Sequence, residues 1–290
     1  MAPLKHFLSN PAWLQQHEFP FTSLDEVPQS VFDDINARLD QKISAEPLVS
    51  VMVIAYNEEI NVLRCVSTLS KLKTTIPFEI VAVNNQSTDR TQETMDRLHI
   101  RNFFQPIQGC GPARQMGQEM AAGKYMLLAD ADCFYPTNWL DEMMKVLQRT
   151  GVVCVYGRYS FIANSQMPRW QLTLHETMKD VIAEFRHYKR PYLNAYGISM
   201  GYVREAGLKA GYMMHNRTWG EDGRLCFDMM PYGQVRQMKV SSARVWTGTR
   251  TLAKDGTLWQ AFRNRARKEF NRAFSYLTPL APHDTKTSAD

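Results

Sequence analysis

The sequence has 290 residues, of which 44% are hydrophobic and 22% are charged, and its formal net charge at pH 7 is +5. A chain of this length can bury a substantial core as one α/β domain with extensions. The mildly basic balance fits phosphate-bearing substrates or an anionic surface, but it is too small to indicate nucleic-acid binding, which we do not expect.

The cysteines and the apolar runs indicate the compartment. The five cysteines are widely spaced and contain no C-x-x-C pair. We therefore expect neither a disulfide framework nor a zinc site, and a reducing cytoplasm is the simpler setting. No apolar run approaches the roughly 20 residues of a membrane span, and the N-terminus lacks a signal-peptide core. We expect a cytoplasmic protein, or one attached peripherally at the inner face of the cytoplasmic membrane.

Residues 1–47 differ in composition from the rest of the chain. Five prolines interrupt them, and Pro28 stands at the first turn of a predicted helix that runs to about residue 43. Val31, Ile35 and Leu39 form the apolar stripe of this helix. We predict an N-terminal arm, residues 1–47, that packs on the main domain.

From residue 48 onward, short apolar runs alternate with segments of helical periodicity. The runs cover residues 48–55, 78–83, 101–105 and 124–130. A predicted helix separates each run from the next, which indicates a parallel sheet with helices on both faces. Ligands of such sheets bind beyond the carboxyl ends of the strands, so the residues that follow these runs are expected on one rim.

Two aspartates separated by one small residue end the fourth run. Strand alternation would direct Asp130 and Asp132 to one side and Ala131 to the other. Two adjacent carboxylates repel each other, so we expect positive charge beside them. Mg²⁺ or Mn²⁺ suits such oxygen ligands and takes phosphate oxygens as further ligands. The alternative is that the two acids cap the next helix, which is predicted to begin near Asn138.

Other side chains of the rim suit a nucleotide diphosphate. Asn84 can both donate to and accept from the edge of a base. Arg114 stands in the first turn of its predicted helix, where the helix dipole and the guanidinium both favour phosphate. The alternative for Arg114 is a solvated helix face. Neither G-x-G-x-x-G nor a G-x-x-x-x-G-K-[ST] loop is present, which argues against dehydrogenases and P-loop NTPases.

Four segments of this region resemble, in order and spacing, the family-2 glycosyltransferases with the GT-A fold. They are VSVMVIAYNEE (49–59), EIVAVNNQSTDRT (79–91), GPARQMG (111–117) and AGKYMLLADAD (122–132). The resemblance covers about 48–135 and implies a Rossmann-type, mostly parallel sheet. It makes residues 48–135 the nucleotide-sugar-binding half of a single GT-A-like domain and residues 136–256 its acceptor-binding half.

The resemblance also implies roles for the residues of the rim. The base and ribose are expected near Ala55, Tyr56, Glu58 and Asn84, with Arg114 nearby. Asp130 and the adjacent Ala131 would meet the nucleoside. Asp132 would meet a Mn²⁺ or Mg²⁺ ion bound to the diphosphate. Where this chain has Asn84 the family more often has Asp, which leaves the base open.

The acceptor half contains a glycine-flanked acidic pair, Glu221 and Asp222, directly before an apolar-periodic segment. One interpretation is a helix N-cap by Asp222. The other is a general base at the helix start, within reach of the attacking hydroxyl and opposite the departing diphosphate. In the family that the chain resembles, this pair supplies the base and its partner.

A long helix is predicted that runs to about residue 188. Trp170, Leu174, Met178, Val181 and Phe185 mark one face of it. We interpret this stripe as packing against the core. The tyrosines that follow the helix suit sugar rings, although a surface cover explains any one of them equally well.

The last part of the chain offers one further site residue and a basic helix. Arg250 is the candidate for an arginine-bearing loop that family members close over the diphosphate. Residues 257–276 predict an amphipathic helix whose basic residues lie largely away from its apolar side. This helix either lies on anionic membrane or covers the fold, and the tail after Pro282 is expected to be disordered.

Together these patterns predict an inverting glycosyltransferase. It would move one sugar from a nucleotide-diphosphate sugar, with a UDP-sugar as the favoured donor, to a hydroxyl of a saccharide or lipid-linked acceptor. The membrane spans of processive synthases are not expected here, which favours single transfer in cell-surface polysaccharide or glycolipid synthesis. The alternatives are a silent nucleotide-sugar sensor or scaffold and a sugar nucleotidylyltransferase. The second usually has a glycine-rich basic loop after the first strand, which this chain lacks.

Overall fold

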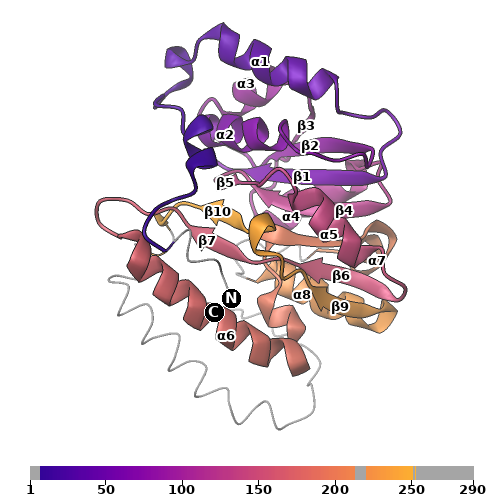
Figure 1. Ribbon diagram of the computed structural model, residues 1–290. Helices are drawn as coiled ribbons and strands as arrows, with labels where there is room; N and C mark the ends of the chain where they lie inside the picture. The colour runs from indigo at the N-terminus through magenta and orange to yellow at the C-terminus, as the bar shows by residue number, and fades with distance from the viewer. Residues whose placement is uncertain (1–6, 213–219, 251, 253–290) are drawn as a thin grey trace, which may run out of the picture.

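The computed structural model describes residues 7–212, 220–250 and 252, which form a layered α/β structure (Figure 1). Its central sheet has seven strands in the order β3-β2-β1-β4-β8-β6-β9. A smaller sheet has the order β5-β10-β7. The predicted α/β class with a mostly parallel sheet is confirmed.

The first half of the domain supplies four parallel strands. Its elements are β1 (Val49–Ala55), α2 (Glu59–Leu69), β2 (Phe78–Asn84), α3 (Thr91–Asp96), β3 (Arg101–Phe104), α4 (Cys110–Met120) and β4 (Tyr125–Asp130). β1 lies between β2 and β4, with Ala55 opposite Asn84 and Ile54 opposite Asp130. The three strands therefore end together and form the predicted rim.

The second half extends the sheet beyond β4. Its elements are β5 (Cys133–Phe134), α5 (Trp139–Leu147), β6 (Val152–Tyr156), β7 (Tyr159–Phe161), α6 (Arg169–Lys189), β8 (Met200–Val203), α7 (Arg204–Ala210), α8 (Glu221–Met229), β9 (Gln234–Gln237) and β10 (Val245–Thr247). β8 runs antiparallel to both β4 and β6. Because β8 is reversed, its amino end lies on the rim, and the short 3₁₀ helix η5 (Gly197–Ser199) before it lies beside the end of β4.

Two apolar layers cover the two faces of the central sheet. Val51 and Val53 point into one layer, which also contains side chains of α2 and α5. Met52, between them, points into the other layer together with side chains of β8 and α8. α4 lies close to this second face, because a Cβ at Gly117 would come within 2.7 Å of the Met52 sulfur. Strand alternation therefore gives each face its own core.

The described part of the N-terminal arm packs on the first layer. Its helix α1 (Gln29–Asp40) begins after Pro28, as predicted, and ends slightly earlier than predicted. Phe32, Ile35 and Leu39 are fully buried in the same cluster as β1 and β2. Asn36 adds polar anchoring, since its amide nitrogen donates to the Arg97 carbonyl oxygen at 2.9 Å.

The predicted apolar stripe of α6 has the expected period, but the prediction that it packs against the core is wrong. Trp170, Leu174, Val181 and Phe185 are 48%, 56%, 52% and 74% exposed. Leu172, which lies outside the stripe, is the fully buried residue of this helix. Periodicity identified the apolar face of α6, but it could not indicate whether another part of the chain covers that face.

Three predictions concern residues outside the described ranges. They are the basic helix over residues 257–276, its alternative roles on a membrane or over the fold, and the tail after Pro282. Within residues 7–212, 220–250 and 252, no helix is both long enough and apolar enough to cross a membrane.

Glu79 ties the strands of the first half together. Its carboxylate accepts hydrogen bonds from the Ser50 hydroxyl and the Ala122 N–H, both at 2.6 Å. Arg101 of β3 lies 2.6 Å from its other oxygen. Burial opposes the charge of Glu79, but these contacts together lower its pKa. The group therefore stabilises the fold above the ordinary glutamate pKa, and this contribution is lost as the pH falls.

We predict that Glu79→Ala lowers the free energy of unfolding at pH 7 by about 2–4 kcal/mol, because it leaves two buried donors without their acceptor and removes the ion pair with Arg101. Urea unfolding measures the change. The matched control is Glu205→Ala, which breaks only an exposed pair with Lys209 and should cost less than about 0.5 kcal/mol. Equal losses in the two variants would refute the proposed anchoring role.

Candidate active site

The first two turns of the rim hold each other in place. The Asn57 side-chain oxygen accepts a hydrogen bond from the Thr88 N–H at 2.8 Å, and the Asn57 N–H donates to the Ser87 hydroxyl at 2.9 Å. Asn57 and Gln86 both adopt left-handed backbone, with φ of 54° and 58°. Non-glycine residues in this region are uncommon and concentrate at functional sites.

Asn84 and Tyr56 differ in how open they are to a ligand. Asn84 is 1% exposed, and its amide nitrogen donates to Gln92 while its oxygen accepts from the Ser87 N–H, both at 2.9 Å. Tyr56 is 43% exposed. Ala55 accepts a backbone bond from Asn85 at 2.8 Å. In this arrangement Asn84 shapes the turn, and Tyr56 offers a flat surface at the mouth of the site.

Asp130, at the end of β4, and Asp132, just after it, pair with two different arginines. Asp130 lies 3.0 Å from Arg114, and Asp132 lies 3.1 Å from Arg250. The expected positive charge is therefore present. Asp130 and Asp132 do not alternate along one strand as predicted, because β4 ends at Asp130 and residues 131–132 form a turn. The capping alternative is also wrong, since α5 starts after Asn138 without a side-chain cap.

Arg114 is the centre of the site. Its side chain is only 6% exposed, and its guanidinium forms ion pairs with Asp130 and with Asp222. Gly197 lies directly against this guanidinium, where a Cβ would overlap its nitrogens. A buried guanidinium is stable only with such partners, so the three charged groups depend on one another. The sequence predicted Arg114 at the nucleotide, whereas its contact with Asp222 was not foreseen.

Asp222 faces the rim and does not cap its own helix. α8 has Gly220 at its N-cap position, with φ of 110°, and Asp222 is the second residue of the helix. The Asp222 carboxylate accepts a hydrogen bond from the Gly197 N–H at 2.7 Å. Glu221 instead binds back to the Gly220 N–H at 3.1 Å. The N-cap interpretation of Asp222 is therefore wrong, and its carboxylate is held toward β4 and η5.

Tyr135 and Gly197 belong to the site although no sequence pattern predicted them there. The buried Tyr135 hydroxyl accepts a hydrogen bond from the Asp130 N–H at 2.9 Å and donates to the Ile198 carbonyl oxygen at 3.1 Å. Burial also raises the pKa of Tyr135 well above its ordinary value, so the hydroxyl stays protonated. Tyr135 thus joins the turn after β4 to η5. No local pattern marks either residue, since both act through contacts distant in sequence.

Arg250 closes the opposite side of the rim. Its guanidinium forms ion pairs with Glu58 and with Asp132, and its side chain is 59% exposed. Glu58 is only 10% exposed in its side chain. Arg250, the predicted loop arginine near the diphosphate, thus pairs with Asp132, the carboxylate that was predicted to hold the metal.

The carboxylates of the rim fit a divalent ion that shares its ligands with a substrate. Burial, followed by the charges of Asp130 and Glu58, raises the pKa of Asp132. A cation is therefore favoured there. Among the described residues, no group of three or more His, Cys, Asp or Glu side chains is placed to hold a metal. Mg²⁺ commonly binds through one or two carboxylates and completes its shell with phosphate oxygens and water.

Comparison with known proteins points to one family. The family model for Glycosyl transferase family 2 matches residues 50–209. The chain is 26% identical over 231 residues to glycosyltransferase AglE of Haloferax volcanii, covering 70% of this chain and 74% of that protein. The residues that the family model matches include Arg114, Asp130 and Asp132.

Solved structures share the fold at low sequence identity. Mannosyltransferase PcManGT from Pyrobaculum calidifontis, in complex with GDP-Man and Mn²⁺, has a TM-score of 0.53 and 16% identity, covering 75% of this chain and 62% of its own. GalNAc-T7 with UDP, GalNAc and Mn²⁺ has a TM-score of 0.54 and 17% identity, covering 71% of this chain and 44% of its own. This chain thus spans less than two thirds of both structures, and the likeness concerns the fold.

The raised pKa of Asp132 gives a prediction for stability. A carboxyl group whose pKa is raised by folding costs stability once the pH exceeds its value in the unfolded chain. We therefore expect Asp132→Asn to melt at a higher temperature than the wild type at pH 7 without nucleotide or metal. The difference should disappear as the pH falls below the ordinary aspartate pKa. Thermal melting at a series of pH values measures it, and a lower melting temperature at pH 7 would show that the pair with Arg250 dominates.

Proposed function

Because this chain belongs to glycosyl transferase family 2, we propose that it moves a single sugar from a nucleotide-diphosphate sugar to an acceptor hydroxyl, with inversion at the anomeric carbon. The observation that carries this proposal is the shared guanidinium of Arg114, which pairs donor-side Asp130 with Asp222. One buried group thereby brings a candidate nucleoside ligand and a candidate base to the same point of the rim.

Asp222 is the proposed general base. Its carboxylate takes the proton of the acceptor hydroxyl as that oxygen attacks the anomeric carbon from the face opposite the diphosphate. The bond from the anomeric carbon to the phosphate oxygen breaks, and the diphosphate leaves with the electron pair. The Gly197 N–H, at 2.7 Å, fixes the orientation of the carboxylate. Glu221, beside it on α8, is the proposed partner on the acceptor side.

The groups around Asp132 are proposed to offset the charge of the leaving diphosphate. Asp132, with Glu58 nearby, would hold Mn²⁺ or Mg²⁺, which would neutralise negative charge on the phosphate oxygens. Arg250 contributes a guanidinium at the same place, 3.1 Å from Asp132. Because Arg250 is largely exposed and Asp132 is largely enclosed, the arginine can move from the carboxylates to the phosphates when a donor binds.

The donor and acceptor are proposed by chemical class. The solved structures with this fold hold either GDP-Man or UDP, and we propose a UDP-sugar. Ala55, Tyr56, Asn84 and Ala131 line the proposed base and ribose site. The acceptor is a saccharide or a lipid-linked saccharide, and the setting is cell-surface polysaccharide or glycolipid synthesis on the cytoplasmic side. The expected absence of the Q-x-x-R-W pattern of processive synthases is wrong, because residues 166–170 read QMPRW. This pattern therefore gives no support to a single transfer, which remains a proposal.

A silent nucleotide-sugar sensor is the second candidate. One observation favours it, since the carboxylate that should act as base is already engaged by Arg114 and Gly197. A carboxylate has room for further hydrogen bonds, however, because its two oxygens offer about four lone-pair sites. We therefore place the enzyme first.

The first prediction of this proposal concerns Asp222→Asn. The amide cannot accept a proton as a carboxylate base, so transfer should fall by roughly 10²–10⁴-fold. Donor binding should change far less than transfer, because Arg114 keeps its pair with Asp130. The matched control is Asp228→Asn, two helical turns along α8, which breaks a pair with Arg224 and should retain most activity. Transfer by Asp222→Asn at nearly the wild-type rate would place the base elsewhere.

The second prediction concerns the donor and the metal. Calorimetry should show that UDP binds more tightly than GDP, and that Mn²⁺ or Mg²⁺ strengthens binding because the diphosphate supplies ligands that the protein lacks. Asp132→Asn should remove most of this metal dependence. Equally tight binding of UDP in excess chelator would contradict the metal, and tighter binding of GDP would contradict the choice of donor.

A further inference from the structure

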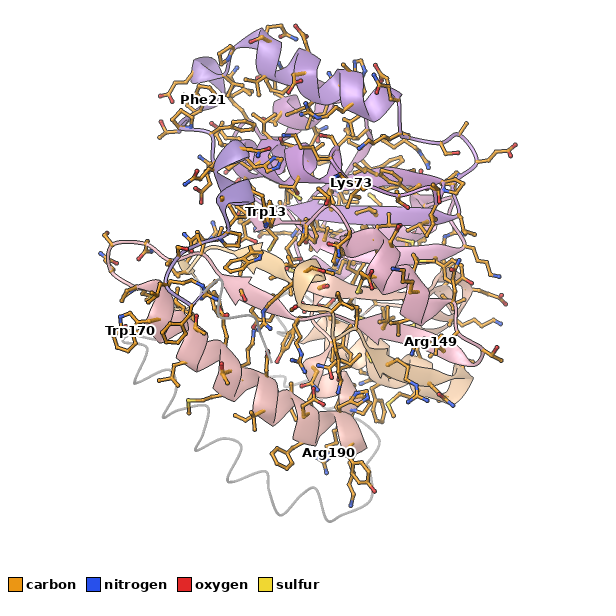
Figure 2. All side chains as sticks on the ribbon, viewed as in Figure 1. Trp13, Phe21, Lys73, Arg149, Trp170 and Arg190 are labelled. Atoms are coloured by element: carbon orange, nitrogen blue, oxygen red, sulfur yellow. The ribbon has the colours of Figure 1, made fainter. Side chains whose placement is uncertain are left out.

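The outer face of α6 carries an apolar stripe that the proposed chemistry does not use. The helix spans 21 residues, Arg169–Lys189. Five of its large apolar or aromatic side chains are 48–85% exposed and recur at helical spacing; they are Trp170, Leu174, Val181, Phe185 and Tyr188. Figure 2 shows Trp170 near the start of α6 and Arg190 just after its end.

All acidic side chains of α6 are turned toward the protein and paired with basic groups. Glu176 is buried against Arg169 at 2.7 Å. Asp180 pairs with Arg244 at 2.7 Å, and Glu184 pairs with Lys239 at 2.6 Å. The outer stripe therefore contains no acidic side chain. Arg186 and Lys189 add positive charge at the C-terminal end of the helix, and Arg190 follows directly.

Basic side chains also gather beside this end of α6. His187 lines a hollow of about 500 Å³ together with Lys145, Arg149, Arg236 and Lys239. The single acidic side chain among the lining residues is Glu142, which pairs with Lys145 at 2.6 Å. His187 faces inward to the Tyr156 hydroxyl at 2.7 Å, so this hollow lies on the inner side of α6. The positive charge nearest the stripe is that at the C-terminal end of the helix, which favours an anionic partner.

We propose that the outer stripe of α6 is a membrane-contact surface that lies in the interface of an anionic lipid bilayer. An apolar face with basic flanks is typical of helices that lie in the plane of the interface. Trp170 and Tyr188 stand at the two ends of the stripe, and both residue types concentrate at membrane interfaces. A second copy of the chain fits less well, because a helix of this length offers about 300 Å² of contact, less than the ~800 Å² per partner of a stable dimer.

The position of α6 gives this surface a purpose in the proposed reaction. α6 continues through the 3₁₀ helix η4 (Pro191–Asn194) into η5, whose Gly197 binds Asp222. A membrane in contact with α6 would therefore lie close to the acceptor side of the site and could present a lipid-linked acceptor to it. This purpose rests on the proposed function, whereas the contact with lipid does not.

The test is co-sedimentation of the full chain with vesicles, which needs no activity. The wild type should bind vesicles that contain phosphatidylglycerol more tightly than vesicles of phosphatidylcholine alone, and added salt should weaken binding. The double variant Val181→Glu with Phe185→Glu should bind at least about tenfold more weakly, because two apolar side chains are replaced by charges that anionic lipid repels. Phe185→Trp should bind as well as the wild type.

The control and the opposing outcomes are defined in the same assay. Tyr232→Glu changes a side chain of similar exposure, 55%, on the 3₁₀ helix η6 (Met230–Tyr232), and should bind like the wild type. Wild-type binding by the α6 double variant would overturn the proposal. The proposal would also be overturned if the double variant melted at a markedly lower temperature and still bound vesicles like the wild type. That result would mean that another part of the same chain covers the stripe. Loss of dimerisation in place of vesicle binding would assign the stripe to a second copy.

Discussion

The site depends on one buried guanidinium. Arg114 is almost completely enclosed, and it stays charged there because Asp130 and Asp222 lie on either side of it. Asp130 ends a strand of the first half, whereas Asp222 begins a helix of the second half. Their common partner therefore fixes the distance between the end of β4 and the start of α8, which are the proposed donor and acceptor sides. Gly197 follows from the same constraint, since any side chain there would occupy the position of the guanidinium.

Much of the first half could be predicted from the sequence. Continuous apolar runs predict buried parallel strands, and parallel strands that end together place Ala55, Asn84 and Asp130 on one rim. The second half was less predictable for physical reasons. β8 is a four-residue strand without a distinctive pattern, and its reversed direction brings η5 to the rim. Tyr135 bonds to Ile198, 63 residues away, and Gly197 bonds to Asp222, 25 residues away, and no local periodicity reports such contacts.

Two features of the molecule favour function over stability. Asp132 is enclosed beside two other carboxylates, which raises its pKa and makes its charged form costly in the absence of a ligand. The stripe of α6 leaves large apolar side chains in water, where they contribute nothing to the core. The proposed cation with a diphosphate would account for the first, and the proposed lipid contact would account for the second. Both explanations place the missing partner outside the chain.

The most direct test of the account is the anomeric configuration of the product. The wild type would be incubated with α-linked UDP-sugars, Mn²⁺ and methanol as a simple acceptor, and the methyl glycoside examined by proton NMR. Direct attack assisted by Asp222 from the face opposite the diphosphate predicts the β-methyl glycoside. The α-methyl glycoside would contradict the single displacement. Cleavage of no sugar nucleotide, despite binding of one, would contradict the enzyme and support the sensor.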